Sequence, residues 1–505
     1  MNSNAYTRLQ ELKARLVEIS DINAAAALLS WDQMTLMPQG GADARGRQLA
    51  TLERLSHEKM INPEIGKLLD GLQPALNELP PDSTEAALIK VATRDHQKAV
   101  KIPTSFTAEF SAHTSKTYEA WARARAEHNF KLVEPLLEKT LELSRQMANF
   151  FPGYQHIADP LIDQLDEGMT VAIIRPLFQK LRSELVPLVE QITSQPEADD
   201  SCLRKNYSEA DQLRFGLEVA KRLGYDFNRG REDKSPHPFT TSFSIGDVRI
   251  TTRIKENLLA EALFSTIHET GHALYEQGFN PDFEGTPLAD GASMTVHESQ
   301  SRLWENLVGK SLSFWQFFYP KLQAVFPNQL TAVPLEAFYR AINKVERSLI
   351  RTDADEVTYN LHVMLRFELE IEMLEGRLAV KNLSEAWNEL YRNDLGVLPS
   401  DESLGVLQDM HWYSGTIGGY FQSYTLGNIL SAQIYEAAVK AVPNIPAEIA
   451  IGNFEHLHYW LKENIYQYGR QYTTREIIKR VTGQPLEIQP YLNYLRHKYG
   501  ELYKL

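Results

Sequence analysis

Apolar residues recur along most of the chain at the three- and four-residue spacing of amphipathic helices. The clearest stripes are Leu9, Leu12, Leu16 and Ile19 near the start of the chain, and Leu361, Leu365 and Leu369 further on. Two turn-forming clusters interrupt the pattern, at residues 79–83 and 194–200, and both are too short to be flexible linkers. No repeat of fixed period is visible. We therefore predict one continuous, mainly α-helical body over residues 1–505.

One segment alternates apolar and polar residues with a period of two instead. The residues facing one way before the expected turn are Phe239, Thr241, Phe243 and Ile245, and those after it are Val248, Ile250 and Ile254. Gly246 and Asp247 between them are typical of a two-residue hairpin turn. The pattern predicts a β-hairpin that ends just before the next helix, with an irregular loop as the alternative.

The segment Asn257–Gln277 is predicted to be an amphipathic helix. Its apolar side consists of Leu259, Leu263, Ile267 and Leu274. Gly278 and Pro281 follow and end the helical pattern.

This helix carries the sequence His268-Glu269-Thr270-Gly271-His272, which matches the motif H-E-x-x-H. Histidines four residues apart lie one turn apart on one helix face, so both imidazoles can bind the same ion. A glutamate directly after the first histidine can accept a proton from a metal-bound water. The alternative is a pair of surface histidines, which the helical context disfavours.

A catalytic zinc ion needs a third protein ligand and one open coordination position. Glu298 lies 26 residues after His272, at the expected start of a second helix with Leu303, Leu307 and Leu312. From these residues alone, Glu298 is either a metal ligand or an ordinary solvated carboxylate.

Composition narrows the classes of partner. The 505 residues are 43% hydrophobic and 23% charged, and the net charge of −14 disfavours nucleic acid or anionic membrane as the main partner. The longest apolar run, Ala24–Leu29, is too short to cross a membrane. Cys202 is the only cysteine and cannot form an intrachain disulfide. With a charged N-terminal stretch, these features predict a cytoplasmic protein.

Several further motifs occur in a fixed order along the chain. They are Trp31–Met34 with Pro38, His237-Pro238-Phe239, Asp247–Thr251 (D-x-R-x-T), His297-Glu298-Ser299-Gln300, Ile350–Asp355 (I-R-x-x-A-D) and Gly405–Trp412 (G-x-x-Q-D-x-H-W). Together with H-E-x-x-H, they resemble the thermostable carboxypeptidase (carboxypeptidase Taq) family of metallocarboxypeptidases. The resemblance spans nearly the whole chain, without a departure inside these motifs.

The resemblance implies a fold similar to neurolysin and angiotensin-converting enzyme, with two helical halves around a long groove. It also implies stepwise removal of C-terminal residues from peptides with broad specificity, in a homodimer. By position, His268, His272 and Glu298 correspond to the zinc ligands, and Glu269 to the general base and acid. Cobalt is an alternative metal for such a site.

The segment from His411 to Tyr424 is similar to the His-and-Tyr donor segment of neurolysin-like enzymes. It offers His411, Tyr420 and Tyr424 as donors to the substrate or to a developing oxyanion. The alternative for such aromatic residues is a place in the core.

An exopeptidase must also recognise a free carboxylate, for which the planar fork of arginine is best suited. The candidates in matched or adjacent segments are Arg351, Arg249 and Arg253. We expect Arg351 to bind the carboxylate, with Asp355 orienting it. The alternative is that Asp355 only forms a helical salt bridge with Arg351.

Two other functions remain open from the sequence. An oligopeptidase would use the same metal chemistry to cut inside short peptides. A helical binding scaffold with an inactive site is disfavoured, because Glu269 has little use outside catalysis.

Overall fold

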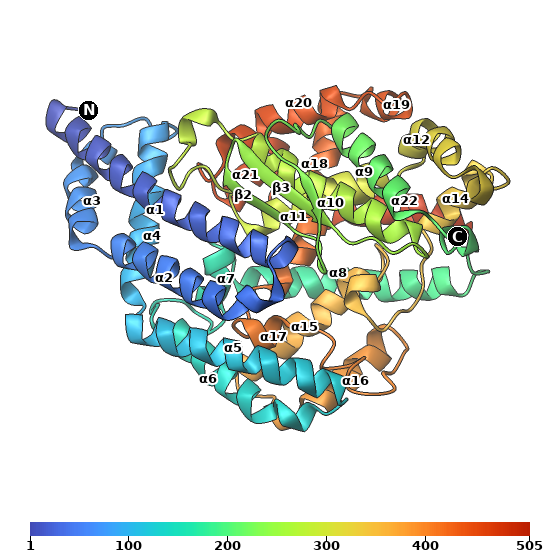
Figure 1. The fold of residues 1–505 in the computed structure, drawn as a ribbon, viewed down its shortest axis with the longest axis horizontal. Helices are drawn as coiled ribbons and strands as arrows, with labels where there is room; N and C mark the ends of the chain where they lie inside the picture. Colours follow the sequence, from blue (N-terminus) through green and yellow to red (C-terminus); the bar gives the residue numbers. More distant parts are fainter. The chain divides into compact units, whose positions relative to one another are not determined.

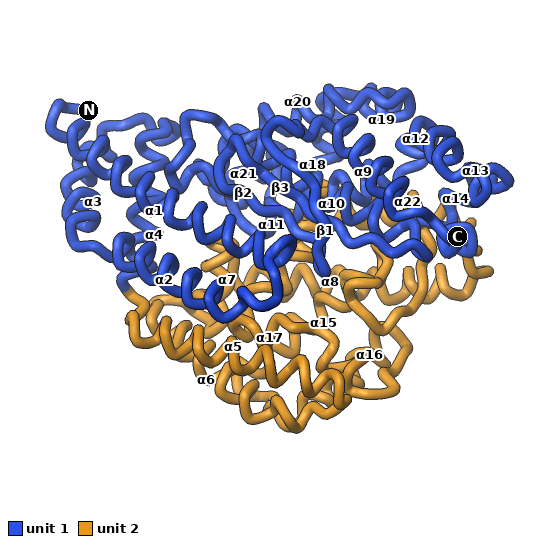
Figure 2. The backbone as a smooth tube through the Cα atoms, viewed as in Figure 1, with its two compact units in different colours: residues 1–100, 200–342, 434–485 blue, residues 101–199, 343–433, 486–505 orange.

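The computed structural model describes all 505 residues and is mostly helical, as predicted. The chain divides into two compact units, each assembled from three separate stretches (Figure 2). Unit 1 comprises residues 1–100, 200–342 and 434–485, and unit 2 comprises residues 101–199, 343–433 and 486–505. The predicted break at 194–200 coincides with a boundary between the units, whereas the break at 79–83 lies inside unit 1. Neither unit is therefore a contiguous segment of the sequence.

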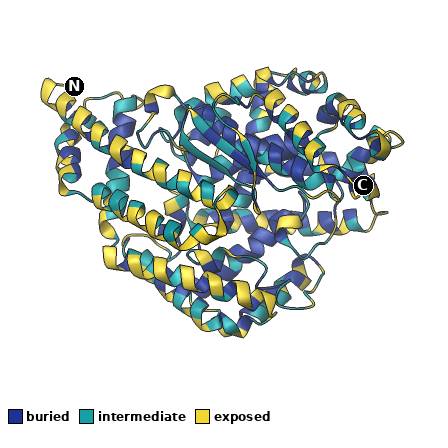
Figure 3. Cartoon of the chain, viewed as in Figure 1, coloured by how far each residue is buried: buried dark blue, intermediate teal, exposed yellow.

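Unit 1 holds most of the helices and the only sheet (Figure 1). Its helices are α1 (Ser3–Thr35), α2 (Ala42–Met60), α3 (Pro63–Leu76), α4 (Thr84–Lys101), α9 (Glu209–Leu223), α10 (Leu259–Gln277), α11 (Met294–Arg302), α12 (Leu312–Val325), α13 (Pro327–Leu330), α14 (Leu335–Ile342), α19 (Ile445–Ala450), α20 (Glu455–Asn464) and α21 (Thr474–Thr482). The stripe Leu9, Leu12, Leu16 and Ile19 is buried where α1 packs beside α2 and α3, while the other side of α1 is exposed (Figure 3).

The predicted hairpin is present and belongs to a three-stranded sheet. Strands β2 (Thr240–Ser244) and β3 (Asp247–Thr252) pair antiparallel, with an irregularity between Ser242 and Ser244. The turn residues are Ile245 and Gly246 rather than Gly246 and Asp247, so the predicted turn was one residue too late. The third strand, β1 (Glu232–Lys234), pairs parallel with β3 and was not predicted.

The two helices expected to carry the metal site pack against each other. Helix α10 also contacts β2, β3 and α9, and most of its residues are buried (Figure 3). Helix α11 begins at Met294, where the Ser293 side chain accepts a hydrogen bond from the Val296 backbone N–H. Glu298 therefore lies in the second turn and not at the helix start as predicted. The chain continues as a π-helix over Leu303–Gly309, so Leu312 begins another helix, α12.

Unit 2 is helical. Its elements are α5 (Thr104–Ala126), α6 (Glu134–Asn149), α7 (Asp159–Leu165), α8 (Val171–Thr193), α15 (Tyr359–Leu374), α16 (Leu383–Asp394), α17 (His411–Ser414), the first part of α18 (Phe421–Ala441) and α22 (Gln489–Tyr503). Helix α15, which carries the stripe Leu361, Leu365 and Leu369, is buried along almost its whole length. No helix of the protein combines the length and apolar composition that a membrane span requires.

Candidate active site

Three side chains of unit 1 converge as a metal-binding set. The ligand atoms of His268, His272 and Glu298 all lie within 4.8 Å of one another. Oε2 of Glu298 is 3.7 Å from Nε2 of His268 and 3.5 Å from Nε2 of His272. Ligands placed tetrahedrally about 2.1 Å from a zinc ion are about 3.4 Å apart. The spacing of these donors therefore fits a single ion of this size.

The other ring nitrogen of each histidine is engaged by a second side chain. Nδ1 of His268 is 2.8 Å from Oε2 of Glu305, which lies in the π-helix. Nδ1 of His272 is 2.6 Å from Nδ1 of His297, the residue before Glu298. Such contacts fix ring orientation, and here both leave Nε2 directed at Glu298.

Glu298 is buried and surrounded by donors and cations. Oε1 accepts a hydrogen bond from Arg302 Nε (2.7 Å), and Oε2 accepts one from Ser301 Oγ (3.1 Å). Burial alone would raise the pKa of Glu298, but Arg302 and the two histidines hold that pKa well below its usual range. Glu298 is therefore an ionised ligand candidate.

The two histidines differ in their electrostatic surroundings. Burial would lower the pKa of His268, yet the carboxylates of Glu298 and Glu305 outweigh that effect and raise it. Burial lowers the pKa of His272 to about 3, so this imidazole is neutral, as a metal ligand must be.

Glu269 is buried beside this set and is held by the hairpin. Thr240 Oγ1 on β2 donates a hydrogen bond to Glu269 Oε2 at 2.6 Å. Burial raises the pKa of Glu269, which is the direction expected for a carboxylate that must accept a proton and release it again. The hairpin thus orients the candidate base, a role that the sequence did not indicate.

In unit 2, Arg351 lies in a short 3-10 turn (Arg351–Asp353) before α15, rather than early in an α-helix. Its side chain is 8% exposed; Nε donates to Asp409 at 2.7 Å and Nη1 donates to Tyr359 Oη at 3.1 Å. Asp355 instead accepts hydrogen bonds from the backbone N–H groups of residues 346, 357 and 358. The predicted pairing of Arg351 with Asp355 is therefore wrong, and Asp409 takes that place.

His411 and Tyr424 belong to the same cluster of unit 2 as Arg351. Nδ1 of His411 contacts Oδ1 of Asp409, and Nε2 of His411 is 3.0 Å from Tyr424 Oη. The Arg351 guanidinium lies 5.3 Å from the centre of the Tyr424 ring. Tyr420 is 38% exposed, with its ring centre 6.0 Å from that of His411. The structure thus brings together the candidate residues that the sequence separates by more than fifty positions.

The alternative arginines are engaged in unit 1. Arg249 on β3 forms a two-bonded pair with Asp247 and lies over the rings of Trp31 and Phe243. Arg253 pairs with Glu261 on α10 and is 42% exposed. Neither arginine belongs to the cluster of unit 2 that contains Arg351, His411 and Tyr424.

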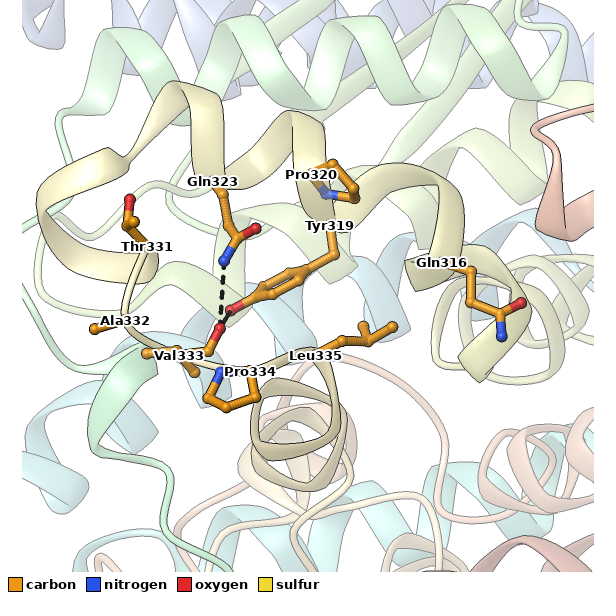
Figure 4. A pocket seen from close by; sticks show the side chains of 9 residues that line it. All are labelled: Gln316, Tyr319, Pro320, Gln323, Thr331, Ala332, Val333, Pro334 and Leu335. Carbon is orange, nitrogen blue, oxygen red and sulfur yellow. Dashed lines mark hydrogen bonds between the residues drawn. The ribbon is translucent and has the colours of Figure 1, made fainter.

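A pocket of about 400 Å³ lies between α12 and the segment Thr331–Leu335 (Figure 4). Tyr319 Oη and Gln323 Nε2 both point to the carbonyl of Val333, at 2.7 and 3.3 Å. The lining contains no charged or metal-binding side chain, so this pocket is not a candidate active site.

Several supporting residues were not predicted as functional. They are Thr240, His297, Arg302, Glu305 and Asp409. His297 and Asp409 stand inside the recognised motifs, so their positions could have suggested a role; the others carry no signal in a single sequence.

Comparison with known proteins agrees with the helical fold and with a metal-dependent enzyme. The family model described as carboxypeptidase Taq (M32) metallopeptidase matches residues 11–499. Thermostable carboxypeptidase 1 of Thermus thermophilus is 39% identical over 99% of both chains. The crystal structure of the M32 carboxypeptidase of Deinococcus radiodurans superposes with a TM-score of 0.96 and 48% identity, over 99% of this chain and 100% of that one. Metallocarboxypeptidase 1 of Trypanosoma cruzi gives 0.93 at 30% identity, over 98% and 99% of the two chains.

The fold and the metal-binding set define a helical metallopeptidase. The chain belongs to the carboxypeptidase Taq (M32) family of metallocarboxypeptidases, and it is a peptide hydrolase.

Proposed function

We propose that the protein is a zinc-dependent carboxypeptidase that releases amino acids one at a time from the free C-terminus of peptides, with broad specificity. The convergence of His268, His272 and Glu298 beside the buried Glu269 carries this proposal. The family's activity supplies the substrate class.

The donor set suits zinc because it offers two imidazole nitrogens and one carboxylate oxygen from the protein, as in catalytic zinc sites. Cobalt fits the same donors. When bound, the metal would lower the pKa of a water molecule toward neutrality and polarise the substrate carbonyl.

Glu269 acts as general base and then as general acid. Its carboxylate takes a proton from the attacking water and passes a proton to the leaving amine. Thr240 fixes one oxygen, Oε2, so the carboxylate does not rotate freely between these two transfers.

The cluster in unit 2 supplies substrate contacts. Arg351 binds the terminal carboxylate through a charge-assisted pair, and His411 and Tyr420 donate hydrogen bonds to the reacting region, with Tyr424 supporting His411. The Asp409 contact supports this assignment for Arg351, because it steadies the guanidinium through Nε, while Tyr359 accepts from Nη1.

We further propose a homodimer, on the resemblance alone, and a cytoplasmic location, since the single cysteine requires no oxidising compartment. Light scattering of the purified protein measures its mass in solution and so tests the homodimer directly.

The metal assignment is tested by elemental analysis. We expect about one zinc per chain in the parent, and loss of most zinc in His268→Ala and in Glu298→Ala, because each change removes one of three protein ligands. His456→Ala is the matched control, since His456 is an exposed histidine of unit 1 on α20 that pairs with Glu448 and lies outside the set. Full zinc in either ligand variant contradicts the proposed site.

A further inference from the structure

We propose that Glu276 and His297 are positioning residues that fix the tautomer of His272, and so keep its Nε2 lone pair available to the metal. This inference rests on the proposed metal site. It concerns one of the two histidine ligands only, because the other one, His268, contacts a carboxylate directly.

Glu276, His297 and His272 are connected by two hydrogen-bond contacts, which we call the relay. It runs from the carboxylate of Glu276 to the imidazole that carries the metal-binding Nε2 atom. Oε1 of Glu276 is 2.7 Å from Nε2 of His297, and Nδ1 of His297 is 2.6 Å from Nδ1 of His272. Glu276 and His272 stand one turn apart on α10, while His297 comes from α11. Ser242 Oγ on β2 donates to the other oxygen of Glu276 at 3.0 Å.

The nitrogen that carries each proton follows from which groups can donate a hydrogen bond and which can only accept one. A carboxylate only accepts, so the proton between Glu276 and His297 lies on Nε2 of His297. Only one proton fits between the two Nδ1 atoms, which are 2.6 Å apart. His272 can bind a metal through Nε2 only if its own proton lies on Nδ1, and Nδ1 of His297 is then the acceptor of that proton. In this arrangement Nε2 of His272 is unprotonated and faces Glu298.

The His297 ring cannot readily turn to reverse this order. The Tyr275 ring packs against it, with centres 5.2 Å apart. The backbone of Gly291 lies so close that a Cβ added there would be 2.6 Å from Cδ2 of His297. The packing holds the ring with Nε2 toward Glu276 and Nδ1 toward His272.

His268 and His272 are oriented by different kinds of neighbour, so mutations of these neighbours should differ in their effect on metal binding. Glu305, which contacts His268, also pairs with Lys310 and Arg302, so its charge is shared among several partners. Glu276 in contrast acts on His272 only through an intervening imidazole. Removing the carboxylate charge of Glu276 should therefore leave the tautomer of His272 unfixed.

Zinc affinity, measured by competition with a chromophoric chelator, tests the relay without using activity. We expect Glu276→Gln to bind zinc about tenfold more weakly, because the amide can present either a donor or an acceptor to His297. His297→Phe keeps a ring but loses the acceptor, and should lose 10- to 100-fold, on the order typical of groups that orient metal ligands.

Glu284→Gln is the matched control. Glu284 is another carboxylate of unit 1, accepts from the Ile245 backbone N–H, and contacts neither histidine. Its zinc affinity should stay within twofold of the parent, and the metal-free proteins should all unfold at similar temperatures if the effect is not a general loss of stability.

The outcomes separate the relay from the site itself. If His272→Ala loses zinc but Glu276→Gln and His297→Phe both bind it within twofold of the parent, the relay is wrong and the site stands. If His272→Ala retains full zinc affinity, the proposed metal site is itself wrong.

Discussion

At the residue scale, the chemistry depends on how firmly a few polar side chains are held. Glu269 is fixed by one hydrogen bond from Thr240, and Glu298 by Arg302 and Ser301. In unit 2, Asp409 contacts both Arg351 and His411, so one carboxylate orients two candidate substrate-binding groups. Arg366, fully buried, donates to the same carboxylate at 3.1 Å. Burial would raise the pKa of Asp409, but Arg351, His411 and Arg366 hold that pKa well below its usual range.

The substitution Glu269→Gln should keep zinc and fold but remove nearly all turnover. The amide fills the same space and can still accept from Thr240, yet it cannot carry a proton between water and amine. We expect kcat to fall by on the order of 10³, measured on a free-acid peptide with zinc content determined in parallel. Activity within tenfold of the parent would show that Glu269 is not the base.

Arg351→Ala should reduce kcat/KM for a free-acid peptide by on the order of a hundredfold, since a charge-assisted pair contributes about 2–3 kcal/mol. Arg351→Lys should recover only part of this, because an ammonium does not present a fork. A C-terminally amidated peptide is the control: already a poor substrate, it should change little.

Comparing the two peptides also shows whether Arg351 binds the substrate carboxylate or only supports the surrounding structure. Loss of Arg351 leaves Asp409 with fewer partners, which would impair both peptides alike. Equal losses on the two peptides would therefore mean that Arg351 only supports Asp409 and does not contact the carboxylate.

The proximity of His268, Glu269 and His272 could be predicted from the sequence because H-E-x-x-H encodes its geometry within one helix, whereas Glu298 was expected only from the family resemblance. The partner of Arg351 could not. A spacing of four suggested Asp355, but the chain forms a 3-10 turn there, and the actual partner lies 58 positions away. Long-range pairings of this kind leave no trace in a single sequence without an alignment.

At the element scale, the site depends on how closely α10 approaches α11. Gly271, between the two histidine ligands, makes this possible: a Cβ added there would lie 2.6 Å from Cα of Ser301 and 2.8 Å from the carbonyl oxygen of Gln300. These are backbone atoms of α11 and cannot move aside individually. The glycine thus sets the distance between the helix that carries the histidines and the helix that carries Glu298.

We accordingly expect Gly271→Ala to weaken zinc binding by on the order of tenfold and to destabilise the fold by about 1–3 kcal/mol, as overpacking does. Gly46→Ala is the control, because Gly46 lies in α2 and an added Cβ would meet nothing within 4 Å. That change should be neutral or stabilising by up to about 1 kcal/mol. Chelator competition and thermal unfolding measure both effects; unchanged zinc affinity in Gly271→Ala would contradict this role for the glycine.

The hairpin β2–β3 and helix α10 were predictable from the spacing of their apolar residues. Apolar residues repeat every two positions in a strand and about every 3.6 positions in a helix, and the two spacings are distinct over segments of this length. The strand β1 was not, since Glu232, Asp233 and Lys234 show no alternation of apolar and polar residues. Its strand character comes from pairing with β3, a tertiary effect. The start of α11 was misplaced for a similar reason: the cap residue Ser293 lies in a run of small residues where no apolar stripe marks the boundary.

At the scale of the whole molecule, the two units interleave along the chain, which composition and periodicity do not reveal. The three metal-binding side chains all belong to unit 1, whereas Arg351, His411, Tyr420 and Tyr424 all belong to unit 2. Each of the two groups of candidate residues is therefore assembled inside one unit, from stretches that are far apart in the sequence.

We propose that the protein removes residues stepwise from a free C-terminus by metal-dependent hydrolysis. Mass spectrometry of a single unmodified peptide over time tests it most directly, with parallel reactions containing a chelator, the Glu269→Gln variant, or the same peptide amidated at its C-terminus. We predict a ladder of products shortened one residue at a time from the C-terminus, lost with chelator, restored by zinc, and almost absent in the other two reactions. Internal fragments, equal cutting of the amidated peptide, or a ladder that persists without metal would contradict the account.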